Sequence, residues 1–333
     1  MIYDATRHPP QRHARHRDMT QPELHHVPCP DTQGAHRMAY WQWGDAHSSH
    51  VVLCVHGLTR QGRDFDTLAR AIVERAAGQV RVICPDVVGR GQSDWLTNPA
   101  GYQVPVYAAD MLVLLAQLHA ECAIVTLDYV GTSMGGLIGM LLAGHAGMPL
   151  PVPFRRLVIN DVGPALDATA LQRIAGYVGQ GGRYASLQEG ADALWALSST
   201  FGPHTPDEWL TLSAPMLVPA AQRSADGAAR RASDADGAPY LLHYDPAIAV
   251  PLRAITADAA AQGEAVMWSL YDAIGARTLL LRGAQSDLLT RETALAMTQR
   301  GPKATLIEFE GVGHAPTFVA PVQSAAVTSF LLD

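Results

Sequence analysis

Apolar residues follow two alternating patterns along most of the chain. Short runs are almost continuously apolar, as in residues 51–55 and 80–84, which is typical of parallel strands buried on both faces. Between them, apolar residues recur at helical spacing, as in residues 65–73 and 109–118. This alternation predicts an α/β fold in which a mostly parallel sheet is flanked by crossover helices. The predicted strands are 38–43, 51–55, 80–84, 123–127, 157–159, 278–281 and 305–309.

The alternation stops after Ile159 and resumes only at Thr278. A connection of this length is unusual as a plain loop in a compact domain, and helical spacing recurs within it. We therefore expect a mostly helical subdomain laid over the sheet. Residues 224–237 lack apolar periodicity and predict a surface loop. The predicted helical stretches are 171–178, 191–197, 214–218 and 265–274.

The N-terminal segment differs in composition from the rest of the chain. Residues 7–17 are rich in charge, His and Pro, and their His spacing is irregular. We expect residues 1–28 to form a disordered tail, or translation to start at Met19. Both interpretations are favoured above a transit peptide or a metal-binding tail.

The charge balance narrows the range of partners. The chain has 24 Lys and Arg against 31 Asp and Glu, a net charge of −7, without a basic block in its body, so we expect no nucleic acid partner. The four cysteines lack metal-ligand spacing, and Cys54 and Cys84 lie in apolar runs, which is typical of buried thiols in a reducing compartment. No apolar run approaches the roughly 18 residues of a membrane span. We expect a cytoplasmic protein without a transmembrane segment, metal or organic cofactor.

The strongest chemical signal is the motif G-x-S-x-G at residues 131–135, which follows a predicted strand and leads into an apolar helical stretch. A sharp strand-to-helix turn strains the backbone of Ser133, and glycines at Gly131 and Gly135 avoid clashes with neighbouring elements. The turn exposes the hydroxyl, and the helix N-terminus favours developing negative charge. In this context the motif predicts a nucleophile rather than a simple Gly-rich turn.

A serine nucleophile needs a base and an acid that orients the base. His314 follows the last predicted strand and is the best candidate for the base. Asp287 follows the preceding strand, and Asp161 follows the strand before that one. Because the usual chain order places the acid late, between serine and histidine, we favour Asp287 and keep Asp161 as the alternative.

Acyl transfer also needs donors for the developing oxyanion. The backbone N–H of Met134, the residue after the nucleophile, supplies one. The loop that begins His56-Gly57-Leu58 supplies the other, because the glycine permits close approach and nominates the N–H of Leu58. We expect His56 to fix this loop by hydrogen bonding. The turn at residues 86–94 has glycines without phosphate-loop spacing, and we expect its polar side chains to brace the same loop.

Together these motifs resemble the α/β-hydrolase superfamily with a cap domain, from about Met38 to the C-terminus. The resemblance implies a mostly parallel eight-stranded sheet with a helical cap inserted after the sixth strand. We place the core at residues 29–164 and 265–333 and the cap at residues 165–264. The resemblance further implies a carboxylic ester hydrolase that acts through a Ser-His-Asp triad and an acyl-enzyme on a small or medium ester or lactone.

Substrate choice is expected to depend mainly on the cap. Trp268 and Tyr271, near its end, are candidate wall residues, although we favour a core position for each. Arg60, beside the oxyanion loop, could meet a substrate carboxylate, but a surface salt bridge is the simpler role. Further candidates for the wall are Met267, Tyr177 and Trp195.

Other functions share this set of residues. They are a C–C bond hydrolase for vinylogous diketones, a cofactor-free haloperoxidase or perhydrolase, and a ligand receptor without turnover. Epoxide hydrolases and haloalkane dehalogenases also resemble the family, but they carry an aspartate at the elbow, and Ser133 argues against both. The expected partner is a small-molecule ester, and a homodimer stays open.

Overall fold

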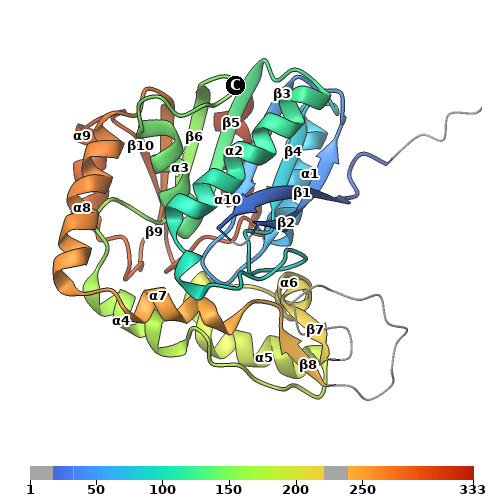
Figure 1. Cartoon of the computed structure of the whole chain (residues 1–333), viewed down its shortest axis with the longest axis vertical. Helices are drawn as coiled ribbons and strands as arrows, with labels where there is room; N and C mark the ends of the chain where they lie inside the picture. Colours follow the sequence, from blue (N-terminus) through green and yellow to red (C-terminus); the bar gives the residue numbers. More distant parts are fainter. Residues whose placement is uncertain (1–17, 33, 221–238) are drawn as a thin grey trace, which may run out of the picture.

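The computed structural model of the chain describes residues 18–32, 34–220 and 239–333, and its centre is an eight-stranded sheet (Figure 1). The strands lie in the order β1-β2-β4-β3-β5-β6-β9-β10. β2 is antiparallel to both of its neighbours, and the strands from β4 to β10 in this order run parallel. The predicted mostly parallel sheet is confirmed. The strands are β1 (Glu23–Asp31), β2 (Gly34–Gly44), β3 (His50–Val55), β4 (Arg81–Pro85), β5 (Thr126–Thr132), β6 (Phe154–Asn160), β9 (Arg277–Gly283) and β10 (Thr305–Phe309).

The parallel strands are apolar throughout because each faces a separate core on either side. Along β3, Val51, Leu53 and Val55 belong to one core, whereas Val52 and Cys54 belong to the other. Helices α2, α3, α8 and α9 contribute to the first core, and α1 and α10 contribute to the second. The helices therefore cover both faces of the sheet. They are α1 (Asp66–Arg75), α2 (Val104–Glu121), α3 (Met134–Gly144), α8 (Ala257–Asp272), α9 (Arg291–Gln299) and α10 (Pro321–Leu332).

The segment between β6 and β9 forms a mostly helical cap at one end of the sheet (Figure 1). Its helices begin at residues that satisfy free backbone N–H groups: Ser186 caps α5, and Thr205 caps α6 in a reciprocal capping box with Glu208. The indole N–H of Trp209 joins α6 to α5 by a 2.7 Å hydrogen bond to the carbonyl of Ala191. The cap elements are α4 (Ala168–Tyr177), α5 (Leu187–Ser198), α6 (Pro206–Ser213), β7 (Leu217–Pro219), β8 (Tyr240–Leu242) and α7 (Ala249–Arg253).

Strand β1 corrects the expectation of a disordered tail over residues 1–28. It pairs with β2 along its whole length and buries Val27 and Cys29. Its two prolines fit because β1 is an edge strand whose alternate residues face outward. Residues 1–17 lie outside the described residues.

Three further expectations concern the cap and the helices. Residues 214–218 were expected to be helical, but a 3-10 turn there leads directly into β7. Helix α8 begins at Ala257, before the expected return to the core at residue 265, and it packs against α3. The loop expected at 224–237 lies outside the described residues. Among the helices that the structure describes, none combines the length and the apolar character that a membrane crossing requires.

Candidate active site

Ser133 lies at the tight turn between β5 and α3. Its backbone has φ 53° and ψ −115°, a conformation that a non-glycine residue rarely adopts. The flanking glycines are needed for space: a Cβ at Gly131 would lie 2.3 Å from the carbonyl oxygen of Gly135, and one at Gly135 would lie 2.0 Å from that of Val55. The turn therefore has the geometry that the motif predicted, with the serine side chain at the carboxyl edge of the sheet.

His314 comes from the loop that follows β10 and reaches back to the serine. Its Nε2 lies 2.9 Å from the Oγ of Ser133. The preceding residue, Gly313, donates its N–H to the carbonyl of Thr200 in the cap at 2.5 Å. The structure therefore brings the predicted base to the predicted nucleophile, and the cap contacts the loop that carries the base.

Asp161, directly after β6, is the acid that contacts His314. Its Oδ2 lies 2.7 Å from the Nδ1 of His314 and accepts a 2.7 Å hydrogen bond from the hydroxyl of Ser286. Its Oδ1 accepts the backbone N–H of Gly283 at 2.8 Å. The residue is fully buried, and its backbone has a positive φ of 57°. With three donors around it, this side chain is held in a single orientation toward the imidazole.

Asp287 does not contact His314, contrary to the preference drawn from chain order. Its Oδ2 pairs instead with the guanidinium of Arg173 on α4 at 2.5 Å, and both side chains are about half exposed. The residue just before it, Ser286, points inward to Asp161. Chain order alone misleads because β6 and β9 are neighbours in the sheet, so loops after either strand can present an acid to the same histidine.

The loop of His56, Gly57 and Leu58 is held from below by a neutral imidazole. The Nε2 of His56 accepts the N–H of Val87 at 2.9 Å, so its proton is on Nδ1, which donates to the carbonyl of Gly57 at 2.7 Å. Complete burial lowers the pKa of His56 to about 3. The expectation that His56 fixes this loop is confirmed, and its neutral form is the one that makes both hydrogen bonds.

Arg90, in the turn after β4, braces the same loop. Its Nε donates to the carbonyl of Leu58 at 2.8 Å, and its Nη1 donates to the carbonyl of Val88 at 2.7 Å. The guanidinium also lies over the rings of Tyr102 and Tyr107. With the Leu58 carbonyl held in this way, the orientation of the adjoining peptide units is restrained. The predicted bracing role of this turn is confirmed.

The two predicted oxyanion donors belong to the loop after β3 and to the start of α3. Leu58 lines the pocket that contains Ser133 and His314. Met134 is the first residue of α3, where backbone N–H groups have no partner within the helix. Leu58 is thus at the pocket that contains Ser133, and Met134 directly follows Ser133 in the chain.

The pocket lies between the carboxyl edge of the sheet and the cap. Its core side is formed by the Gly57–Leu58 loop, Ser133 and His314. Its cap side is mainly apolar and aromatic, and three tyrosines contribute to it. The cap residues that line it include Arg173, Ile174, Tyr177, Tyr184, Leu194, Leu197, Phe201, Met216, Leu242 and Tyr244.

Two predicted wall residues lie elsewhere. Tyr271 is fully buried in α8, where its hydroxyl donates to the carbonyl of Met297 at 2.6 Å. Trp268 packs edge-on against Tyr271 and lies 4.1 Å beneath the guanidinium of Arg300. Neither lines the pocket, because α8 packs on the core helix α3 rather than over the site.

The cap side of the pocket comes mainly from α4 and α5, and sequence reasoning picked out only one of its lining residues. Tyr177 lines the pocket as expected, whereas Trp195 packs against Trp209 in the cap and Met267 lies outside the lining. Arg173 lies one helical turn before Tyr177 and shares its face. That spacing was the available signal for Arg173, which sequence reasoning missed.

Arg60 lines the pocket, but its charge is already paired inside the protein. Its Nε and Nη2 make two short hydrogen bonds, of 2.6 and 2.7 Å, to the carboxylate of Asp64. Nη2 also donates to the carbonyl of Leu212 in the cap at 3.2 Å. The salt bridge expected as the simpler role is present, and it is partly buried rather than on the open surface.

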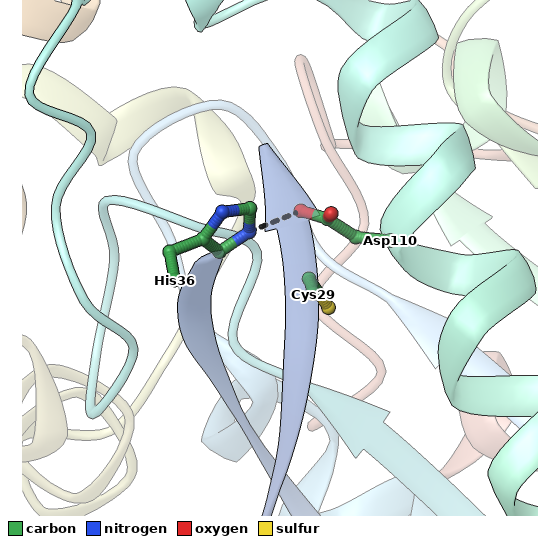
Figure 2. A group of neighbouring side chains, drawn as sticks. All are labelled: Cys29, His36 and Asp110. Carbon is green, nitrogen blue, oxygen red and sulfur yellow. Dashed lines mark hydrogen bonds and ion pairs between the residues drawn. The ribbon is translucent and has the colours of Figure 1, made fainter. Parts of the chain in front are cut away.

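One group of side chains, away from the pocket, has the composition of a metal site. Figure 2 shows Cys29 and His36 from the β1–β2 hairpin facing Asp110 of α2, and their ligand atoms lie within 4.8 Å of one another. Both imidazole nitrogens already have carboxylate partners, Asp31 at 3.1 Å and Asp110 at 3.0 Å. Burial and the nearby Asp110 raise the pKa of the Cys29 thiol, which keeps it protonated. The group fits a hydrogen-bonded link between hairpin and helix better than a metal centre.

Comparison with known proteins places this geometry in context. Residues 50–321 match the family model described as alpha/beta hydrolase fold. A 3-hydroxybutyrate-oligomer hydrolase of Cupriavidus necator is 47% identical over 309 residues, which cover 93% of this chain and 97% of that protein. The crystal structure of an alpha/beta hydrolase from Novosphingobium aromaticivorans is 34% identical, with a TM-score of 0.73 and coverage of 93% of this chain and 98% of that one.

A more distant structure shares the fold alone. The thioesterase domain from the curacin biosynthetic pathway is 18% identical, with a TM-score of 0.65, over 93% of this chain and all of that one (100%).

Proposed function

The chain belongs to the α/β-hydrolase family and is an esterase-type hydrolase, and from this premise we propose that it cleaves short oligoesters of hydroxy acids through Ser133, His314 and Asp161. The observation that carries the proposal is the continuous contact from the Oγ of Ser133 through His314 to the buried Asp161. Asp161 takes the role that sequence order had assigned to Asp287.

Acylation begins with the attack of the Ser133 Oγ on the ester carbonyl. His314 accepts the hydroxyl proton on Nε2 as the new C–O bond forms, and Asp161 stabilises the resulting imidazolium through Nδ1–H. The carbonyl oxygen becomes an oxyanion, which the N–H groups of Leu58 and Met134 stabilise. Cleavage of the ester C–O bond then releases the alcohol, which takes its proton from His314. The product on the enzyme is an acyl ester of Ser133.

Deacylation repeats these steps with water as the nucleophile. The Nε2 of His314 removes a proton from the water as the oxygen attacks the acyl carbonyl. The same two backbone N–H groups stabilise the second tetrahedral intermediate. Its collapse returns the proton to the Oγ of Ser133 and releases the carboxylic acid.

The substrate class rests on the relative and on the pocket wall. The Cupriavidus necator protein, 47% identical over nearly the whole chain, is named a 3-hydroxybutyrate-oligomer hydrolase. The cap side of the pocket offers aliphatic side chains such as Ile174 and Leu194, which suit a short methyl-branched chain, and tyrosines whose hydroxyl groups suit its ester oxygens. Short 3-hydroxybutyrate oligomers are the first substrates to test.

The test uses the purified full chain and a Ser133→Ala variant with matched circular dichroism and melting temperature. Both are assayed with the dimer and trimer of 3-hydroxybutyrate and with p-nitrophenyl esters from acetate to long-chain acyl groups. We expect turnover of the oligomers and the short-chain esters by the wild type and loss of turnover in Ser133→Ala. Absence of turnover on every ester by folded wild-type protein would overturn the proposal and favour a C–C bond hydrolase or a ligand receptor.

A further inference from the structure

The charged side chains that line the pocket are of one sign. Arg60 and Arg173 contribute guanidinium groups, and no Asp or Glu is among the described residues that line it. A pocket walled by apolar and tyrosine side chains attenuates charge less than open water does. An uncompensated guanidinium in such a wall would favour a substrate that carries a carboxylate.

The two arginines differ in whether they are available to a ligand. Arg60 is 9% exposed and is held by Asp64 and by the Leu212 carbonyl, so its charge is balanced within the fold. The Arg173 side chain is 44% exposed and pairs with Asp287, whose side chain is 50% exposed. Surface ion pairs of this kind contribute little to stability, since water solvates both partners well when they separate. Arg173 can therefore exchange its partner at small cost.

Arg173 is also placed to reach the substrate. It lies on α4 of the cap, and its side chain lines the same pocket as Ser133 and His314. Both its Nε and its Nη2 donate to one oxygen of Asp287, at 3.0 and 2.5 Å. A substrate carboxylate offers the same acceptor chemistry, and it offers two oxygens to the planar guanidinium.

We propose that Arg173 binds the free carboxylate of an acidic ester substrate, with Asp287 as the group it exchanges for that carboxylate. Arg173 is thus the residue that selects oligoesters ending in a carboxylate over neutral esters of the same length. This assignment rests on the proposed function. It transfers to Arg173 the carboxylate role that the sequence had suggested for Arg60.

The experiment compares the 3-hydroxybutyrate dimer as its free acid with the methyl ester of the same dimer, and follows cleavage of the internal ester. The ratio of the two kcat/KM values is the readout. In Arg173→Gln we expect this ratio to fall roughly tenfold to a hundredfold, mainly through a higher KM for the free acid. Arg173→Lys should recover part of the ratio, because it retains the charge without the planar fork.

Asp287→Asn is the matched control from the other side of the ion pair. It removes the competing carboxylate, so the KM for the free acid should fall while that for the methyl ester stays the same. The role of Arg173 would be overturned by equal losses of kcat/KM on both dimers in Arg173→Gln. It would also be overturned if neither Arg173→Gln nor Asp287→Asn changed the ratio of the two kcat/KM values. Failure of the wild type to cleave either dimer would instead overturn the proposed function.

Discussion

At the residue scale, Asp161 contacts the imidazole of His314, whereas Asp287 pairs with Arg173. The elbow at Ser133 could be predicted because a Cβ at either flanking glycine would lie only 2.0–2.3 Å from a carbonyl oxygen, and this requirement for glycine leaves a pattern in the sequence. The acid could not be predicted with the same ease. Asp161 and Asp287 both follow parallel strands, and only their tertiary contacts, three inward donors for one and a half-exposed arginine for the other, distinguish them.

Substitution of each aspartate by asparagine separates their roles. Asp161→Asn should lower kcat on p-nitrophenyl butyrate by on the order of a thousandfold or more, because the imidazole loses the carboxylate that fixes its tautomer and stabilises its charge. Asp287→Asn should stay within about twofold of the wild type on this neutral ester, because its carboxylate does not contact His314. Steady-state kinetics of both folded variants is the measurement, and a larger loss in Asp287→Asn would contradict the assignment.

His56 makes folding stability dependent on pH. Its pKa is lowered to about 3 in the fold by burial, and it returns to about 6.5 on unfolding. At a pH below the pKa of His56 in the unfolded chain, the unfolded chain binds a proton at His56 that the folded chain does not bind. The His56 contribution to stability is thus fully present above about pH 6.5 and is lost progressively toward pH 3, a change of several kcal/mol.

A variant isolates this contribution from other titrating groups. His56→Asn should be less stable than the wild type at neutral pH, and the difference between the two should shrink as the pH falls from 6.5 to 4. Urea unfolding at several pH values measures it. A difference that grows on acidification would contradict the neutral, buried state of His56.

At the scale of elements, the sequence predicts buried strands well and edges poorly. Residues 51–55 are apolar because β3 faces a core on both sides, so the pattern is unambiguous. β1 was missed because an edge strand buries only alternate residues and tolerates two prolines. β5 was expected at residues 123–127 but spans Thr126–Thr132, because the strand continues into the nucleophile turn, where polar and glycine residues interrupt the apolar run.

The β1–β2 hairpin is held to α2 by His36. Burial by itself would lower the pKa of this imidazole, but the hydrogen bonds and charges of Asp110 and Asp31 together raise it. His36→Gln removes the imidazole that lies 3.0 Å from the carboxylate of Asp110, a side chain in a residue that is only 2% exposed. Because a buried acceptor loses its hydrogen-bond partner, we expect a loss of roughly 1–3 kcal/mol in the free energy of unfolding.

Denaturant unfolding at neutral pH checks this loss, and His47→Gln, at an exposed histidine of the β2–β3 loop, is the control. The control should stay close to wild-type stability. If His36→Gln were as stable as His47→Gln, the contact of His36 with Asp110 would not stabilise the fold.

At the scale of the whole molecule, the pocket lies between the carboxyl edge of the sheet and the cap. The sequence predicts the first of these parts better than the second. The carboxyl edge of the sheet follows from topology, because parallel strands present their following loops at one edge. The presence of a cap could be predicted from the interrupted alternation of strands and helices. Which of its side chains face the pocket could not be predicted, because this depends on how α4 and α5 pack over the site and how α8 returns to the core.

Contacts between the cap and the core connect substrate selection to the catalytic loop. The Thr200 carbonyl accepts the N–H of Gly313, next to the base, and the Nε2 of His204 lies 2.9 Å from the hydroxyl of Thr317. The exposed pair of Arg173 and Asp287 also joins the two parts. The cap therefore contributes to the position of the loop that carries His314 as well as to the pocket wall.

The central claim is that Ser133 forms a covalent acyl-enzyme, and covalent trapping tests it most directly. The wild-type chain and Ser133→Ala are incubated with a p-nitrophenyl alkylphosphonate, an analogue of the tetrahedral intermediate, and examined by intact mass and peptide mapping. We predict one adduct per wild-type chain, located on Ser133, that forms in step with the loss of esterase activity and is absent from the variant. Esterase activity that persists without an adduct, or an adduct at another residue with matching loss of activity, would contradict the account.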